Sequence, residues 1–299
     1  MRVGFHIPIR GGFVQAVDRA VRTGCEAFQI FSRSPRAWAG KPLDPQEVND
    51  FRKARKEAKL TPLAVHLPYL PNLATNSPGL REKSVRLLSE ELTRAERLGA
   101  DFLVAHPGHV PKGESREPAI MRVAQSVVEV LSAQANDLNV TLLLENTSGQ
   151  QAELGASLSE LAQMYEAIMN QTSHGLRVGV CLDTAHAWGA GYDLARPRGQ
   201  EEMLAEFDRV LGMENLSLIH FNDSLAALGS RRDRHSAIGQ GQIGARGLAR
   251  LVRHSALEHL AGLMETPRET EENDLANMAR VKRWRRNRKP RDRVSKSKS

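Results

Sequence analysis

Eight short apolar runs recur along the chain, and segments with helical periodicity separate them. Runs of about four to eight residues, bounded by Gly or Pro, are typical of buried parallel strands. They lie near residues 2–8, 27–31, 62–68, 102–108, 141–147, 178–184, 216–222 and 261–267. This alternation predicts an α/β fold, a parallel sheet closed into a (β/α)₈ TIM barrel with helices outside. An open, doubly wound sheet is the weaker alternative, because no Gly-rich dinucleotide loop follows the first run.

The segments between the runs contain good helix formers on apolar stripes. We expect helices from Pro78 to Leu98, from Pro118 to Ala135 and from Ser157 to Met169. The last begins with a capping-box spacing, in which Ser157 precedes Glu160 by three residues. No linker or internal repeat interrupts the pattern before the end of the chain. The sequence therefore predicts one barrel domain over residues 1–281.

The positive charge of the chain is concentrated at its C-terminus. Residues 282–299 hold ten Lys or Arg and one Asp, a net +9, whereas the other 281 residues hold 32 Lys or Arg against 34 Asp or Glu, a net −2. A block of like charges with Ser and Pro and few apolar residues predicts a disordered tail. The tail could serve only solubility, or it could be a flexible arm that binds phosphates.

Cysteine content and hydropathy indicate a cytoplasmic protein. Cys25 and Cys181 are far apart and form no CxxC motif, so we expect both to be reduced core residues. No stretch approaches the roughly 18 apolar residues of a membrane helix. A strand-like segment begins at Arg2, so we expect no signal peptide and no association with a membrane.

Six of the eight runs end on a residue that can bind a metal ion. These residues are His66, His106, Glu145, Asp183, His220 and Glu265. The C-terminal ends of barrel strands meet at one face, so the six side chains should converge there. The sequence therefore predicts a metal site at that face.

Two short motifs add three candidates to this set. They are Asp183-Thr-Ala-His186 and Asp233-Arg-His235. Imidazole and carboxylate donors without thiolate suit Zn²⁺, Mn²⁺ or Fe²⁺. A catalytic zinc typically takes three protein ligands, so nine donors fit about three ions. Clustered cations match a phosphodiester, whose transition state spreads negative charge over several oxygens.

Each candidate also has an ordinary structural interpretation. A single His at a strand end is more often a hydrogen-bonded core residue. Asp183 could be only a helix cap, and Asp233 with His235 could form a polar turn. The hypothesis depends on so many ligand types occurring at the same end of the strands. His6, His109 and His174 are weaker candidates.

Three connections after strands are long for a barrel, and such loops form the active face. They span residues 32–44, 69–79 and 223–244 and contain Arg36, Trp38, Tyr69, Leu70, Arg231, Arg232 and Arg234. Cationic and apolar side chains on loops suit an unstacked nucleic acid. Ordinary loop packing is the alternative.

At the level of motifs the chain resembles the endonuclease IV family of apurinic/apyrimidinic (AP) endonucleases. The matching segments run nearly end to end and leave out only the tail. They are residues 4–12, 28–38, 65–74, 106–108, 144–147, 181–193, 219–223, 228–244 and 264–267. The resemblance implies a (β/α)₈ barrel with a three-zinc site whose nine ligand positions are all filled in this chain.

The family assigns those nine residues to three ions. His66 and His106 would hold one zinc, and Glu145 would bridge it to a second. Asp183, His220 and Glu265 would complete the second. His186, Asp233 and His235 would hold the third, and Mn²⁺ or Fe²⁺ could replace zinc at one site. Glu145 and Glu265 are the carboxylates we expect to be catalytic.

The resemblance also implies the reaction and the DNA contacts. The family cleaves double-stranded DNA 5′ to an abasic site, which leaves a 3′-hydroxyl and a 5′-deoxyribose phosphate, and it trims blocked 3′ ends. Arg36, Tyr69 and Leu70 match positions that enter the DNA and fill the gap opposite the flipped nucleotide. We expect a monomer that acts in base-excision repair.

Three positions depart from the family's pattern. Leu225 stands where Lys is common, Ser236 follows Asp-Arg-His, and Gln240 replaces a Glu. None is an expected ligand, so they put the rate in doubt more than the type of reaction.

Two other functions stay open. A sugar isomerase or epimerase of the related barrel group would use one ion, held by Glu145, Asp183, His220 and Glu265, and would leave five candidates unexplained. A non-catalytic nucleic-acid binder would depend on the tail alone.

Overall fold

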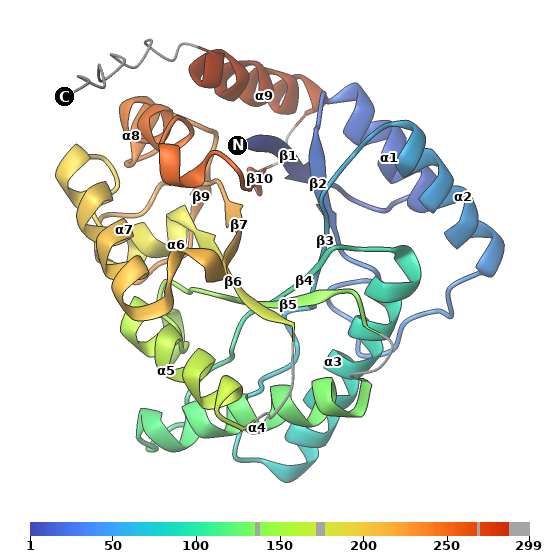
Figure 1. Cartoon of the computed structure of the whole chain (residues 1–299), viewed down its shortest axis with the longest axis vertical. Coiled ribbons are helices and arrows are strands. Elements are labelled where there is room, and N and C mark those ends of the chain that lie inside the picture. The colour runs from blue at the N-terminus through green and yellow to red at the C-terminus, as the bar shows by residue number, and fades with distance from the viewer. Residues whose placement is uncertain (135–137, 172–176, 268–269, 287–299) are drawn as a thin grey trace, which may run out of the picture.

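Eight parallel strands close into a barrel within the residues that the structure, a computed structural model, describes: 1–134, 138–171, 177–267 and 270–286. Their order around the barrel is β1-β10-β7-β6-β5-β4-β3-β2, and helices form a ring outside them (Figure 1). The strands are β1 (Arg2–His6), β2 (Ala27–Ile30), β3 (Leu63–His66), β4 (Phe102–Ala105), β5 (Thr141–Glu145), β6 (Val178–Asp183), β7 (Leu216–His220) and β10 (Ala261–Met264). The predicted (β/α)₈ barrel and all eight of its strands are confirmed.

The connections carry the helices and one small antiparallel sheet. The helices are α1 (Phe13–Arg22), α2 (Pro45–Glu57), α3 (Pro78–Leu98), α4 (Arg116–Gln134), α5 (Leu158–Met169), α6 (Thr184–Ala190), α7 (Pro197–Leu211), α8 (Gly244–Leu251) and α9 (Glu271–Arg286). Short 3₁₀ turns lie at Gln150–Ala152, Met213–Asn215 and Ser255–Leu257. The small sheet pairs β8 (Asp223–Ser224) with β9 (His235–Ser236).

Local sequence signals determine where the helices begin and end. Ser157 caps α5 by accepting a hydrogen bond from the backbone of Glu160 at 3.1 Å, as its spacing predicts. Asp44 caps α2 in the same way, with Pro45 in the first turn. Helix α3 ends at Gly99, whose left-handed φ of 68° favours glycine.

The core has two layers, because side chains alternate between the two faces of each strand. In β3, Ala64 faces the barrel interior, and Val65 packs in the outer layer between strands and helices. Cys181 lies in the interior layer and Cys25 in the outer one, and both are buried core residues that form no disulfide within the described residues, as expected. The interior layer supports the strand ends from below, which places the candidate ligands on a rigid base.

The C-terminal helix extends past the predicted domain boundary at residue 281. Helix α9 continues to Arg286, so residues 282–286 are helical although charge composition predicted a disordered tail from 282. The Arg285 guanidinium pairs with Glu26 at 2.6 and 2.8 Å, and this contact with the barrel explains the extra turn. Residues 287–299 of the predicted tail lie outside the described residues.

Among the helices of the described segments, none is both long and apolar enough to cross a membrane.

Candidate metal centre

The nine candidate ligands lie together at the C-terminal ends of the barrel strands. Six stand at or directly after the ends of β3, β4, β5, β6, β7 and β10. The other three are His186 in α6, Asp233 in the segment before β9 and His235 in β9. Their donor atoms form three overlapping groups, each within 4.8 Å: His66, His106 and Glu145; Glu145, Asp183, His220 and Glu265; and Asp183, His186 and His235. Asp233, the ninth candidate, contacts the third group. The geometry of each group could hold a metal ion.

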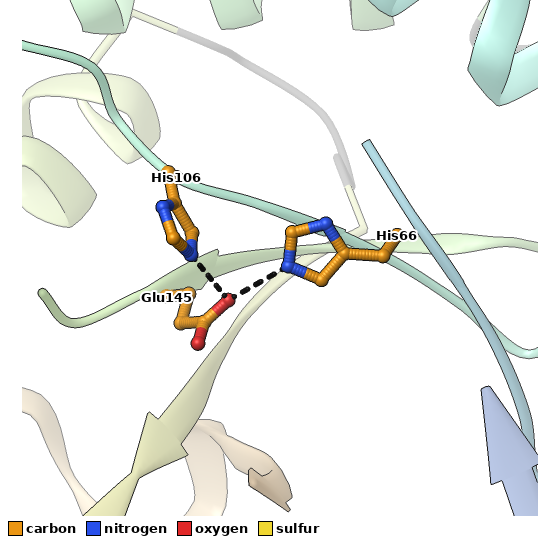
Figure 2. Close-up of side chains that lie close together, drawn as sticks. All are labelled: His66, His106 and Glu145. Atoms are coloured by element: carbon orange, nitrogen blue, oxygen red, sulfur yellow. Dashed lines mark hydrogen bonds and ion pairs between the residues drawn. The ribbon is translucent and has the colours of Figure 1, made fainter. Parts of the chain in front are cut away.

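In the first group, two imidazoles face one carboxylate oxygen. Nε2 of His66 lies 3.1 Å from Oε2 of Glu145, and Nε2 of His106 lies 3.0 Å from the same atom (Figure 2). Glu145 is fully buried at the end of β5, and His66 is buried at the end of β3. The two rings and the carboxylate therefore point at a common centre.

The second group shares Glu145 with the first. Its other oxygen, Oε1, lies 2.8 Å from Nδ1 of His220, and Oε2 of Glu265 lies 3.6 Å from that same nitrogen. Oδ2 of Asp183 is 3.9 Å from it. Glu145 therefore has one oxygen in each group, which is the arrangement a bridging carboxylate requires.

Asp183 has two roles at once. Its Oδ1 accepts hydrogen bonds from the backbone of Ala185 at 2.6 Å and of His186 at 2.8 Å, so it caps α6. Its Oδ2 accepts from Asn222 at 2.7 Å and faces the cluster. The cap interpretation of Asp183 is correct, yet the cap uses only one carboxylate oxygen. His186, which follows in α6, is buried rather than exposed.

In the third group, Asp233 lies between two imidazoles. Its Oδ2 is 3.3 Å from Nε2 of His186, and its Oδ1 is 3.1 Å from Nε2 of His235. Asp233 is the most exposed of the nine candidates, with a side chain 40% accessible. It therefore lies at the edge of the cluster, where a substrate could reach it.

A buried carboxylate shapes the long loop that presents Asp233 and His235. Asp223 accepts four backbone hydrogen bonds, from Ser224 (2.9 Å), Gly241 (2.9 Å), Ile243 (3.1 Å) and Gly244 (3.2 Å). These donors lie at both ends of residues 223–244. The two ends are therefore held together, and the residues between them are directed to the barrel mouth.

In four histidines, the ring nitrogen that points away from the cluster carries the proton. The ring nitrogen that faces the cluster is therefore unprotonated. Nδ1 donates to a backbone carbonyl in His66 (2.7 Å), His186 (2.8 Å) and His235 (3.0 Å). In His220, Nε2 donates to the side-chain oxygen of Gln29 at 2.9 Å. A neutral imidazole carries one proton, so the nitrogen that faces the cluster has a free lone pair. This is the tautomer that a metal ligand needs.

One of the buried side-chain atoms that lack a hydrogen-bond partner in the described part of the chain belongs to the cluster. Nε2 of His235 makes no hydrogen bond of acceptable geometry, although Asp233 and Asp183 are 3.1 and 3.7 Å away. Buried polar atoms without partners are rare, and a site for an ion is one common reason. The donor set therefore fits divalent cations bound between these residues.

The charges of the cluster also indicate that positive charge must lie between these residues. Burial raises the pKa of Glu145, but the charges of His220 and His106 outweigh burial and hold it well below its usual range. Burial lowers the pKa of His235, but its contact with Asp233 and the charge of Asp183 raise it to about 9. Four carboxylates in one buried site need positive charge nearby, from protonated imidazoles or from cations.

A cavity of about 1060 Å³ opens beside the cluster. Its lining includes Asp233, His235 and Glu265 from the cluster and Tyr69 and Leu225 from the loops. Tyr69 is 61% exposed, and its ring lies 5.8 Å from that of His66. Tyr69 thus combines exposed aromatic surface with a position next to the candidate ligands.

The other two positions expected to enter the DNA, Arg36 and Leu70, do not line this cavity, whereas the loop cation Arg234 does. Arg36 is exposed on the loop after β2, and Leu70 is half-buried directly after Tyr69. Among the three departures, Leu225 is 61% exposed at the cavity, Gln240 is exposed, and Ser236 is buried in β9.

Sequence patterns missed several residues that contact the candidate ligands. They are Gln29, Asn146 and Asn222, and sequence patterns also missed Asp223, which holds the ends of residues 223–244; all four are buried. Asn146 and Asn222 both bond Asp183. The sequence shows these residues only as polar positions inside or next to apolar runs. That position suggests a buried polar side chain but does not tell which residue it contacts. Of the weaker candidates, His6 lies 3.3 Å from Glu265, and His174 lies outside the described residues.

Comparison with known proteins gives one family over nearly the whole chain. The profile of the xylose isomerase-like TIM barrel family matches residues 17–288. A protein named probable endonuclease 4 from Cenarchaeum symbiosum is 41% identical over 281 residues, which cover 93% of this chain and 97% of that protein. The crystal structure of endonuclease IV from Thermus thermophilus superposes with a TM-score of 0.83 at 36% identity, over 95% of this chain and 98% of that one.

Sugar epimerases of related fold are more distant. A D-tagatose 3-epimerase-like protein superposes with a TM-score of 0.69 at 16% identity, over 95% of this chain and 97% of that one. A match at this identity indicates a shared fold only.

Proposed function

The chain belongs to the endonuclease IV family of xylose isomerase-like TIM barrels, and from this premise we propose that it is a metal-dependent AP endonuclease of base-excision repair. Its substrate would be double-stranded DNA with an abasic site. It would hydrolyse the phosphodiester 5′ to that site, leaving a 3′-hydroxyl and a 5′-deoxyribose phosphate, and would trim blocked 3′ ends. The convergence of eight donor residues in three overlapping groups, with Asp233 in contact with the third, is the observation that carries this proposal.

We assign the nine residues to three Zn²⁺ ions. His66, His106 and Glu145 would hold the first, and Glu145, Asp183, His220 and Glu265 the second. His186, Asp233 and His235 would hold the third, with Asp183 close enough to contribute. Nitrogen and oxygen donors also suit Mn²⁺ or Fe²⁺ at one of these sites. Bound there, such ions would activate water and neutralise the charge that develops on a phosphodiester.

The chain's own residues would bind and orient the DNA. Tyr69 has the exposed apolar surface to fill the gap left by a flipped nucleotide, and Leu70 follows it on the same loop. Arg36 would contribute a cation for the backbone phosphates. Glu145 and Glu265 would keep the ions in position beside the cavity, where the abasic nucleotide would lie. Flipping costs least where pairing is already lost.

The quaternary state and location follow from the same features. Every proposed ligand comes from one chain, so a monomer is sufficient. The substrate would be double-stranded DNA, so we expect the protein in the cytoplasm, at the nucleoid when it is bound to DNA.

A one-ion sugar isomerase is less supported. It would use only Glu145, Asp183, His220 and Glu265, and would leave His66, His106, His186, Asp233 and His235 without a role. The epimerase similarity is limited to fold.

Incision of a duplex with one abasic analogue tests the proposal. Metal-replete protein should cut 5′ to the analogue, and a strong chelator should stop it. Glu145→Gln should lose activity by several orders of magnitude, because it removes a charged ligand shared by two groups. Glu160→Gln, a buried glutamate on α5 that pairs with Arg116, is the matched control and should keep activity. The proposal fails if replete protein does not cut, or if cutting survives both chelation and Glu145→Gln.

A further inference from the structure

Strand β2 supplies none of the nine proposed ligands, yet it places a polar side chain against them. Gln29 is fully buried between Phe28 and Ile30 in an otherwise apolar strand. Its side-chain oxygen accepts from Nε2 of His220 at 2.9 Å, and its amide nitrogen donates to Oε1 of Glu265 at 2.7 Å. The same nitrogen lies 2.9 Å from Nδ1 of His6. The carboxamide of Gln29 therefore connects two proposed ligands, His220 and Glu265, with the ring of His6.

The oxygen of Gln29 determines which nitrogen of His220 carries the proton. A carboxamide oxygen only accepts hydrogen bonds, so Nε2 of His220 must be protonated. Nδ1, which lies 2.8 Å from Glu145, then has its lone pair free. Without this acceptor the imidazole could adopt the other tautomer, and a proton on Nδ1 would occupy the position that a cation needs.

The amide hydrogens of Gln29 determine how Glu265 is turned. The bond to Oε1 holds that oxygen away from the cluster, and Oε2 is left 3.6 Å from Nδ1 of His220. Nδ1 of His6 lies 3.3 Å from the same Oε1, so Gln29 and His6 hold this oxygen together, and Gln29 makes the shorter contact. Gln29 thus restrains two of the four members of the second group at once.

We propose that Gln29 is the positioning residue of the group Glu145, Asp183, His220 and Glu265, which it prepares for a divalent cation by fixing the tautomer of His220 and the rotation of Glu265. This inference rests on the proposed function only in so far as the group binds a cation. Gln29 itself needs no contact with the cation or with DNA.

A second buried glutamine shows what a structural role looks like in this chain. The amide nitrogen of Gln200 on α7 donates to the backbone carbonyls of Leu194 (2.5 Å) and Gly247 (3.0 Å), so it ties two backbone segments together. The side chain of Gln29, by contrast, bonds the side chains of His6, His220 and Glu265 at the cluster. Loss of Gln29 should therefore affect cation binding, whereas loss of Gln200 should affect only stability.

The test measures zinc content and affinity in Gln29→Met and Gln200→Met, two variants of the full chain. Each protein is loaded with zinc and dialysed against buffers of graded free zinc, and bound zinc is measured by elemental analysis. In Gln29→Met, we expect one ion to bind about 10- to 100-fold more weakly, as is typical when an outer hydrogen bond to a ligand is lost. Incision of abasic duplex should lose kcat with KM unchanged. Gln200→Met should keep wild-type zinc binding.

Two outcomes would overturn the inference: zinc binding by Gln29→Met equal to that of the wild type, or an equal weakening in Gln200→Met. If Gln29→Met does not fold, Gln29→Asn replaces it. This side chain is polar but one methylene shorter, so it cannot reach His220 and Glu265 together and should also weaken one ion. If the wild type does not cut abasic DNA but Gln29→Met still weakens the binding of one ion, the proposed function fails and the inference stands.

Discussion

Asp223 offers the sharpest test of how the loop before β9 is held at the metal centre. Its buried carboxylate accepts four backbone hydrogen bonds from the two ends of residues 223–244. Three of the donors share Oδ1, and the N–H of Gly241 alone bonds Oδ2. Asp223→Asn keeps one oxygen but replaces the other with an amide group that cannot accept the N–H of Gly241.

The size of the effect follows from these contacts. A hydrogen bond to a charged group contributes about 1.5–3 kcal/mol, and one of the four is lost outright. The other three lose their charge assistance and weaken. We expect the free energy of unfolding to fall by about 3 kcal/mol. The loop should also hold His235 and Asp233 less firmly, so the third zinc should bind more weakly.

Urea unfolding of the zinc-free protein, combined with zinc analysis of the loaded protein, measures both effects. Asp44→Asn is the matched control, because Asp44 caps α2 at the surface and Asn caps a helix about equally well. We expect the control to change stability by less than about 0.5 kcal/mol. The reasoning is refuted if Asp223→Asn lies as close to the wild type as the control does and retains all its zinc.

Three further predictions concern DNA binding and the C-terminus. Tyr69→Ala should weaken binding to abasic duplex more than to intact duplex in a fluorescence titration, and equal losses would contradict its gap-filling role. Leu225→Lys adds a cation at the cavity, so the slope of log affinity against log salt should steepen by about one if it meets a phosphate; an unchanged slope would place the DNA elsewhere. Truncation after Arg286 should leave thermal stability unchanged, whereas truncation after Val281 should lower it by removing Lys282 and Arg285, which bond Gly24 and Glu26.

The sequence predicted the barrel and the convergence of the ligand types for a simple physical reason. Buried strands are short apolar runs, and parallel strands bring their C-terminal ends to one face. His66 and Glu145 therefore had to lie at the same end of the barrel. The distance between them was not predictable, because it depends on the register of neighbouring strands.

Other features needed three-dimensional contacts that no local pattern contains. Asp183 was predicted either as a cap or as a ligand, and its two oxygens face the helix and the cluster separately. Gln29 gave no signal beyond being polar in an apolar strand, since the two proposed ligands that it bonds, His220 and Glu265, are more than 190 residues away along the chain. Residues 282–286 looked disordered by charge alone, but the partner of Arg285 is Glu26, at the other end of the chain.

The number of metal ions per chain tests the central claim most directly. Protein loaded with zinc and freed of unbound metal should contain about three ions by elemental analysis, because eight donor residues form three groups and Asp233 adjoins the third. His186→Ala together with His235→Ala should reduce this number to about two. About one ion per chain in the wild type, or none, would contradict the account of a three-ion centre for phosphodiester hydrolysis.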